Sequence, residues 1–205
     1  MASITLELLR RRFGGSSGYV WLESISNGVT AGQCAVMPTA LVPDDANWAF
    51  VGSYMRTGAM GASYVGVMSA YTSEQANCYR IIRNASQDDA WLVNAYSKAG
   101  GGSTMIAHVN SLNTWYDYEL KYGELVLNNV PRTLVTPQGS GTMTGQLTLC
   151  NTNFPQRIRE FKAYHNGNLV AQMKPCKRKS DGVVGMYDIV RGQFFTSSNQ
   201  YNFTE

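Results

Sequence analysis

Short stretches of alternating apolar and polar residues, each ended by turn residues, make up most of the chain from Tyr19 onward. A period of two is the pattern of a β-strand with one buried face, and most of these stretches are rich in aromatic or β-branched residues. The predicted strands cover residues 19–25, 33–37, 48–54, 63–70, 78–84, 90–96, 104–109, 115–120, 124–127, 132–136, 145–150, 157–165, 168–173, 183–190 and 193–196.

Turn residues between these stretches support the strand pattern. Asn166-Gly167 lies between two predicted strands and is a strong hairpin signal, and Asn128-Asn129 suits a similar tight turn because Asn tolerates positive φ. From Tyr19 onward the single helical signal is the capping box Thr72-Ser73-Glu74-Gln75, which predicts one turn of helix before Cys78. Parallel α/β folds need helical crossovers, so the chain is expected to be a sandwich of antiparallel sheets or a jelly roll.

Two of the predicted strands carry further information. In the stretch 157–165, Ile158 falls on one face of a regular strand and Phe161 and Ala163 fall on the other, which predicts a bulge or a shared edge there. The stretch 183–190 is apolar on both faces and is predicted to be a central strand, in which Gly185 permits the close approach of a neighbour. Asp188 in that strand is expected to accept hydrogen bonds from a turn or from a basic side chain.

The first residues differ from the rest of the chain. Ile4, Leu8 and Leu9 fall near one face of a short helix, and an arginine cluster after them suits a helix C-terminus. A helix this short is marginal in water, so the segment must dock on its own domain or on a partner. We therefore predict a helical or extended anchoring and oligomerisation segment at 1–13, a Gly/Ser hinge at 14–18 and a jelly-roll domain at 19–205. The predicted assembly residues are Ile4, Leu8, Leu9, Arg10, Arg11 and Arg12.

Composition narrows the class of protein. The chain has 205 residues, 44% of them hydrophobic and 15% charged, which fits one globular domain with fewer charges than the usual ~25%. No apolar run approaches the ~20 residues of a membrane span, and the N-terminal charges follow the apolar residues, the reverse of a secretory signal. A net charge of +3 argues against nucleic acid as a partner. Without an export signal, the four cysteines are expected to be reduced, with two disulfides as the alternative.

Few residues suggest catalysis. The string Gly-x-Ser-x-Gly around Ser16 resembles a nucleophile elbow, but it lies in the Gly/Ser hinge rather than between a strand and a helix. His108 and His165 lie in strand patterns without a metal-type partner spacing, so both are expected to be structural. Asp117 and Glu119 are two apart and share a face, which we interpret as the polar face of a strand rather than as an acid pair. The sequence therefore predicts no catalytic residue, no metal site and no cofactor.

Aromatic residues offer the main possibility for binding. Flat rings are suited to stacking on sugars, although core packing is the commoner use of Trp48, Trp91 and Trp115. Trp91 is the first candidate for an exposed ring, since it follows a polar loop whose acids and amides suit hydroxyl groups. The predicted glycan-binding residues are Trp91, Tyr96, Asp88 and Asp89.

The C-terminal third resembles a known family. The stretches 157–170 and 174–196 contain a hairpin, a Lys-Pro-Cys element, a Ser-Asp-Gly turn, a Gly-Met-Tyr-Asp strand and a final Phe-Phe strand. They are similar to the end of the concanavalin A-like, laminin-G-like jelly-roll proteins of tailed phages and gut-bacterial prophages. Met186 replaces the family's usual Leu, and Phe195 its usual Tyr. The opening strand at 19–24 and the Phe-Val-Gly-Ser stretch at 50–53 resemble the family more weakly, and the family's Thr-Gln-Tyr-Ile-Asp-Thr-Gly string is missing.

This resemblance implies a fold and a function. The implied fold is an all-β, concanavalin A-like jelly-roll sandwich of two antiparallel sheets. The implied function is that of a non-enzymatic virion protein, displayed on the particle surface and made in the host cytoplasm, that adheres to host glycans. Its partners would be other virion proteins, bound through the N-terminal segment, and further copies of itself, as a trimer by analogy. A stand-alone carbohydrate-binding module is the alternative, and a polysaccharide hydrolase or lyase is a third hypothesis that lacks an acid pair.

Overall fold

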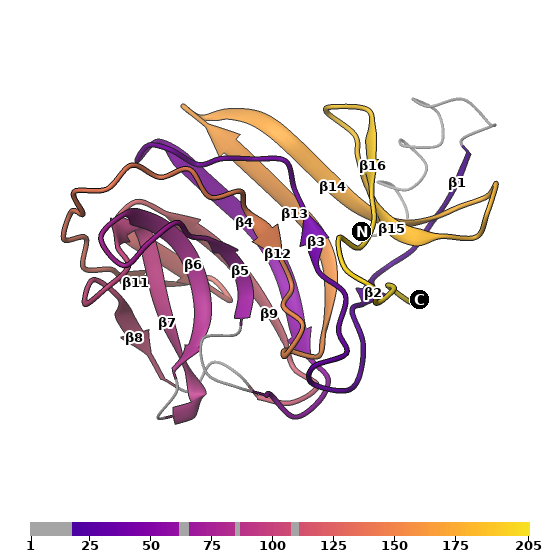
Figure 1. Cartoon of the computed structure of the whole chain (residues 1–205), viewed down its shortest axis with the longest axis horizontal. Coiled ribbons are helices and arrows are strands. Elements are labelled where there is room, and N and C mark those ends of the chain that lie inside the picture. Colours follow the sequence, from indigo (N-terminus) through magenta and orange to yellow (C-terminus); the bar gives the residue numbers. More distant parts are fainter. Residues whose placement is uncertain (1–17, 62–65, 85–86, 108–110) are drawn as a thin grey trace.

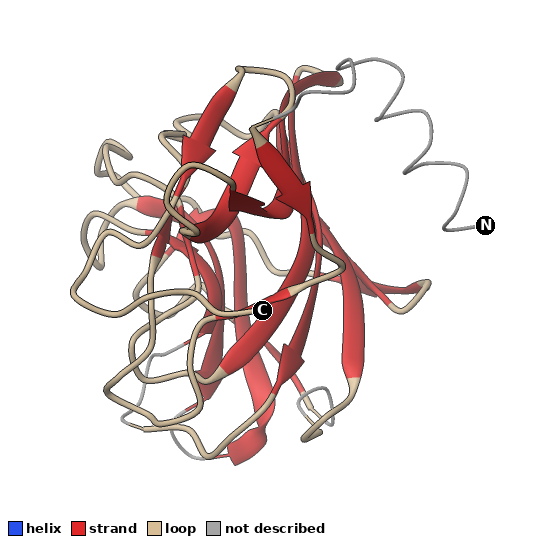
Figure 2. Cartoon of the chain, turned by 90° about the vertical axis from the view of Figure 1, so that its right-hand side faces the viewer, coloured by secondary structure: helices blue, strands red, loops and turns tan. Residues whose placement is uncertain are grey.

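The chain is built from strands and loops. The computed structural model describes residues 18–61, 66–84, 87–107 and 111–205, and Figure 2 shows no helix among them. The predicted helical turn at 72–75 is wrong, because the capping hydroxyl is used elsewhere. Thr72 Oγ1 accepts the backbone N–H groups of Thr144 and Gly145, both at 2.9 Å, and so ties two loops together instead of starting a helix.

The larger sheet has ten strands. Along its main path the order is β11-β10-β9-β4-β13-β14-β15-β16, while β1 pairs with β14 and β2 pairs with β13. The bounds are β1 Tyr19–Trp21, β2 Ile25–Ser26, β4 Trp48–Arg56, β9 Trp115–Lys121, β10 Glu124–Leu127, β11 Val130–Thr133, β13 Gln156–His165, β14 Asn168–Arg178, β15 Val184–Asp188 and β16 Gln193–Phe195.

The smaller sheet has six strands in the order β3-β12-β5-β6-β7-β8. The bounds are β3 Met37–Pro38, β5 Gly66–Ala70, β6 Asn77–Asn84, β7 Gln87–Lys98, β8 Thr104–Ile106 and β12 Thr148–Leu149. The paired strands of both sheets run antiparallel.

The chain moves back and forth between the two sheets. It passes from β3 to β4, returns for β5–β8, crosses again for β9–β11, returns for β12 and ends with β13–β16 in the larger sheet (Figure 1). Such alternation, with long connections over the ends of a two-layer sandwich, is the arrangement of a jelly roll. The predicted all-β fold of two antiparallel sheets is confirmed. The predicted anchor at 1–13 and all but Gly18 of the hinge lie outside the described residues.

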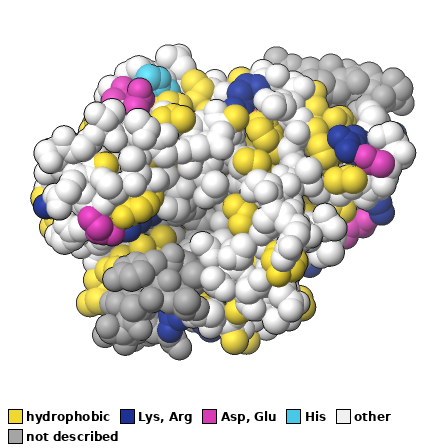
Figure 3. Space-filling model, viewed as in Figure 1, with side chains coloured by type: hydrophobic (Ala, Val, Ile, Leu, Met, Phe, Trp, Pro, Cys, Tyr) yellow, Lys and Arg dark blue, Asp and Glu magenta, His cyan; other side chains and the backbone are white. Residues whose placement is uncertain are grey.

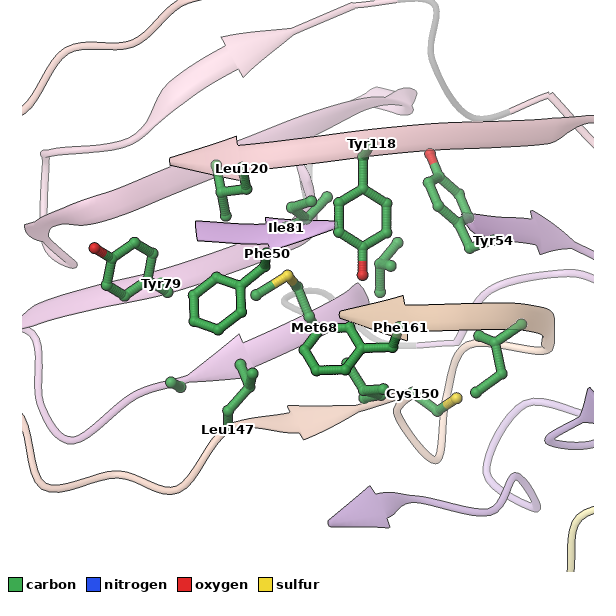
Figure 4. Close-up of a cluster of buried hydrophobic side chains, with 14 of the residues drawn as sticks. Phe50, Tyr54, Met68, Tyr79, Ile81, Tyr118, Leu120, Leu147, Cys150 and Phe161 are labelled. Atoms are coloured by element: carbon green, nitrogen blue, oxygen red, sulfur yellow. The ribbon is translucent and has the colours of Figure 1, made fainter. Parts of the chain in front are cut away.

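The hydrophobic core fills the space between the sheets. Figure 4 shows Phe50 and Phe161 from the larger sheet facing Tyr79 from the smaller one. The Phe50 ring stacks at 6.0 Å on Phe161 and meets Tyr79 edge-on at 5.2 Å. Gly52 leaves room for the buried Tyr118 ring, because a Cβ on Gly52 would lie 2.6 Å from the Tyr118 hydroxyl. Because the apolar faces of the two sheets pack against each other, the polar faces of the strands point outward on both sides of the sandwich.

The details predicted for two strands are confirmed. The pairing of β13 with β4 shifts between Ile158 and Phe161, and this bulge brings both side chains into the core. β15 lies between β14 and β16, and a Cβ on Gly185 would lie 2.2 Å from the Phe195 carbonyl oxygen. The Asp188 side chain is fully buried; it accepts the Val190 N–H at 2.9 Å and a hydrogen bond from the Arg191 guanidinium.

Candidate ligand-binding site

The first predicted platform, Trp91, lies in the core. Its side chain is 1% exposed, its Nε1–H donates to the Tyr54 hydroxyl at 2.7 Å, and its ring meets Phe154 edge-on at 5.3 Å. Val93 and Ala95 follow it at the same strand period, and both are buried. The prediction that Trp91 presents its ring to a sugar is therefore wrong, since both ring faces are covered by protein.

The other predicted glycan residues are not gathered around Trp91. Tyr96 is partly buried and donates its hydroxyl to the Asp44 carbonyl oxygen at 2.9 Å. It is five positions from Trp91 along β7, a separation of about 16 Å in a strand. Asp88 and Asp89 are part of β7, and their side chains lie outside the described part. The predicted assembly residues, from Ile4 to Arg12, also lie outside it.

A hollow of about 230 Å³ opens on the outer face of the larger sheet. Asp117 and Glu119 line it from β9, and the buried Tyr116, Tyr118 and Leu120 alternate with them on the core side. The interpretation of these two acids as the outward face of a strand is confirmed. Across the hollow from them, β4 contributes Val51 and Ser53 and β13 contributes Glu160 and Lys162.

Hydrogen bonds fix two of the three carboxylates of the hollow, those of Asp117 and Glu160. Ser53 Oγ donates to Asp117 Oδ1 at 2.5 Å across the β4–β9 pair. Gln172 Nε2 donates to Glu160 Oε1 at 2.6 Å, and the Nζ atoms of Lys162 and Lys174 lie 2.9 and 3.3 Å from the Glu160 carboxylate. These bonds fix the positions of side chains that project from strands rather than from loops.

The same bonds keep Glu160 ionised. Burial raises the pKa of this carboxyl group, but the hydrogen bonds from Gln172 and Lys162 and the charge of Lys174 outweigh it and lower the pKa below the ordinary value. The hollow therefore offers charged acceptor oxygens at neutral pH, together with the ammonium of Lys162 as a donor.

The remaining candidate rings are covered by neighbours. The Arg159 guanidinium lies 3.8 Å from the Trp115 ring centroid, which hides one face of this ring beside the hollow. Trp48 is buried and stacks on His165 at 4.7 Å, so the structural interpretation of His165 is supported. His108 lies outside the described residues.

Other sites are absent from the part of the chain that the structure covers. Among the described residues, no group of three or more His, Cys, Asp or Glu side chains is placed to hold a metal ion. No helix in the described ranges is long and apolar enough to cross a membrane. The four cysteines are buried and unpaired, as expected for reduced thiols.

Sequence reasoning missed most of the residues that line the hollow. Ser53, Glu160 and Lys162 come from strands far from β9 in the sequence, and each occupies an outward position on its strand. The alternation along 48–54 was a signal for Ser53. For Glu160 the signal was hidden, because the bulge after Ile158 reverses which positions face outward.

The chain matches no family model and no curated protein. It is similar to the crystal structure of A. japonicus CB05, with 14% identity and a TM-score of 0.42, over 73% of this chain and 27% of that chain. It is also similar to the crystal structure of Caenorhabditis elegans galectin LEC-6, with 14% identity and a TM-score of 0.37, over 70% of this chain and 96% of that chain. This chain thus spans about a quarter of the length of the first structure. The fold class rests on the two antiparallel sheets and their registers rather than on these likenesses.

Proposed function

We propose that the protein is a non-enzymatic saccharide-binding protein and that the hollow on the larger sheet is its binding site. The observation that carries this proposal is the set of carboxylate oxygens of Asp117, Glu119 and Glu160 around one hollow of about 230 Å³. That volume equals about eight water molecules in the liquid and suits one sugar ring better than a large ligand. Sugar hydroxyl groups donate readily to such oxygens in charge-assisted hydrogen bonds.

The rigidity of the hollow supports binding. Its polar side chains project from paired strands, and Ser53 and Gln172 hold two of the carboxylates by short hydrogen bonds. A ligand that enters such a site orders few side chains, so little of the interaction energy is lost to conformational entropy.

The chemistry of the carboxyl groups argues against hydrolysis. A glycosidase needs one carboxyl group that stays protonated by a raised pKa and a second one across the scissile bond. Each described carboxyl group whose pKa is shifted has it lowered, namely those of Asp45, Glu160 and Asp181. Asp117 and Glu119 project from one strand in the same direction, and Glu160, which lies across the hollow from them, has a lowered pKa and is therefore unsuited to act as the protonated acid. We therefore infer binding without bond cleavage.

An oligosaccharide array tests the proposal. The full chain should bind at least one saccharide, and Asp117→Asn and Glu119→Gln should each weaken that binding about tenfold or more, as expected for a lost charge-assisted bond. Asp181→Asn, which removes the same charge from an exposed turn, is the matched control and should bind normally. An array without any bound saccharide, or equal binding by all variants, would reject the site. Release of reducing sugar from a bound polysaccharide would reject the non-enzymatic assignment.

The placement on a phage particle is the finer part of the proposal. It is supported by the resemblance of the stretches 157–170 and 174–196 to phage jelly-roll proteins. It requires that the segment 1–13 joins copies of the chain or docks on another virion protein. A stand-alone carbohydrate-binding module would use the same hollow without such assembly. A defined oligomer in solution would support the virion placement, whereas a monomer would exclude self-assembly through this segment and leave only docking on another protein.

A further inference from the structure

A buried arginine lies on the outer face of the smaller sheet, on the side of the sandwich opposite the hollow. Arg80 of β6 is only 7% exposed, and its strand neighbours Tyr79 and Ile81 point into the core. Its Nε donates to Asn94 Oδ1 at 2.7 Å, and its Nη2 donates to the Ala99 carbonyl oxygen at 2.7 Å and to Ser103 Oγ at 3.3 Å. These acceptors are all neutral.

The charge of Arg80 has no direct ion-pair partner, although the Glu74 carboxylate lies nearby on the Tyr71 hydroxyl. No carboxylate of the described residues lies within ion-pair distance of its guanidinium. A buried cation without a paired anion is costly, and buried charges are commonly paired. Nη1 of Arg80 makes no hydrogen bond to the described part of the chain, and this atom is accessible to solvent. Two N–H donors of a largely desolvated cation are therefore directed to the surface.

An exposed aromatic ring lies beside these donors. Tyr71 is 41% exposed, and its ring centroid is 5.7 Å from Cζ of Arg80. The Tyr71 hydroxyl donates to Glu74 Oε1 at 3.0 Å. The loop that carries both residues is fixed, because the Gly100 N–H donates to the Glu74 carbonyl oxygen at 2.8 Å and Thr72 ties it to a second loop.

We propose that this corner is a second binding site, which takes a saccharide bearing a carboxylate, such as a uronic acid. The carboxylate would accept from Nη1 of Arg80, and the apolar face of the sugar ring would lie on Tyr71. A carboxylate supplies the anion that Arg80 lacks, and the bond between a guanidinium and a carboxylate is among the stronger hydrogen bonds in proteins. Figure 3 shows that charged side chains are sparse on the face of the molecule drawn there.

The charge of the neighbouring Glu74 distinguishes an anionic ligand from a neutral one. Its carboxylate repels an anionic ligand, whereas it would attract a neutral sugar as a hydrogen-bond acceptor. Glu74→Gln keeps the shape of the side chain and removes only the charge. The substitution should therefore strengthen the binding of an anionic sugar and weaken the binding of a neutral one that uses the carboxylate.

The test uses two sugars that differ in one group. Glucuronate and glucose have the same ring, and only glucuronate carries the carboxylate. Titration of the isotope-labelled full chain with each at millimolar concentration should move the amide signals around Tyr71 with glucuronate and not with glucose. Glu74→Gln should tighten glucuronate binding about two- to fivefold, the usual size of one exposed like-charge contact. Tyr71→Ala should weaken it by a similar or larger factor.

Two further variants keep the result interpretable. Arg80→Lys should abolish the glucuronate response. Because Arg80 is buried, the circular dichroism spectrum of this variant must match that of the parent chain. Asp181→Asn, which removes a carboxylate from an exposed turn outside both proposed sites, should leave glucuronate binding unchanged. The amide signals around Tyr71 report on this corner alone, so this site and the hollow succeed or fail separately. Equal responses to both sugars, no response to glucuronate, or weaker glucuronate binding by Glu74→Gln would each overturn the proposal.

Discussion

Replacement of Trp91 by alanine separates a core residue from a surface platform. The side chain is 1% exposed and packs edge-on against Tyr54 and Phe154, at 5.7 and 5.3 Å between ring centroids. Burial of the 150–250 Å² of a Trp side chain at about 25 cal/mol per Å² contributes about 4–6 kcal/mol. Large-to-small changes at such sites cost about 3–5 kcal/mol, because the core relaxes only in part around the cavity.

Urea unfolding, followed by far-ultraviolet circular dichroism, measures this cost without relying on tryptophan fluorescence. In a thermal melt of a domain of this size, each kcal/mol of lost stability lowers Tm by about 2–4 °C. The Tm of Trp91→Ala should therefore lie about 6–20 °C below that of the parent chain. Trp115→Ala is the matched control. It removes a partly exposed ring and one cation–π contact with Arg159, and should cost about 1 kcal/mol.

The opposite outcome would show that Trp91 is not a core residue. If Trp91→Ala loses less than about 1 kcal/mol while saccharide binding disappears, the ring cannot fill the core as described. If both variants lose the same stability, burial does not distinguish them. The expected result is a large loss of stability at Trp91 alone, with saccharide binding by the folded fraction unchanged.

Four further predictions follow from other parts of the chain. Gly185→Ala should cost about 1–3 kcal/mol in urea unfolding, since the new Cβ would lie 2.2 Å from a carbonyl oxygen of the adjacent strand; an unchanged midpoint would show that β16 can shift freely. The folded state lowers the pKa of Glu160, so the unfolded state binds more protons in acid, and the stabilisation that is present above the ordinary pKa of 4.5 is lost as pH falls. Glu160→Gln should therefore flatten the loss of stability between about pH 5 and pH 3, and a curve as steep as that of the parent chain would contradict this. Burial raises the pKa of all four cysteine thiols, so the native chain should resist alkylation at pH 8 and react fully in denaturant, as mass spectrometry would show. Light scattering should find an oligomer for the full chain and a monomer both for a chain that begins at Tyr19 and for the double variant Leu8→Ser, Leu9→Ser; monomers throughout would exclude self-assembly through residues 2–13.

Period-two patterning predicted the class of fold and the direction of many side chains, but not every strand. The stretch 33–37 was predicted to be a strand, yet only Met37–Pro38 pairs within a sheet. The backbone before it is held by loops instead: the Ala35 N–H donates to the Asn27 carbonyl oxygen at 2.6 Å, and the Asn27 amide donates to the Phe154 carbonyl oxygen at 3.0 Å. Hydrogen bonds between backbone groups and residues far away in the sequence cannot be predicted from the local pattern of residues.

The binding surfaces were harder to predict for the same reason. Alternation correctly directed Asp117 and Glu119 outward, but the registers that bring Ser53 and Glu160 beside them join strands distant in the sequence. The choice of Trp91 failed because a polar loop before a strand says nothing about which face of that strand is covered. Burial on both sides of a ring depends on the second sheet, which a single stretch of sequence does not specify.

The two proposed sites differ in charge and lie on opposite faces of one rigid sandwich. The hollow presents the carboxylates of Asp117 and Glu119, which disfavour an acidic sugar, whereas the Arg80 corner requires one. A chain with both sites would therefore bind two different saccharides, or two kinds of unit in one mixed polysaccharide. It would bridge them without a conformational change, because both sites are fixed by paired strands and hydrogen-bonded loops. Assembly through the N-terminal segment would multiply each weak contact by the copy number, so binding to a polymer should exceed binding to its single units by far more than the number of units.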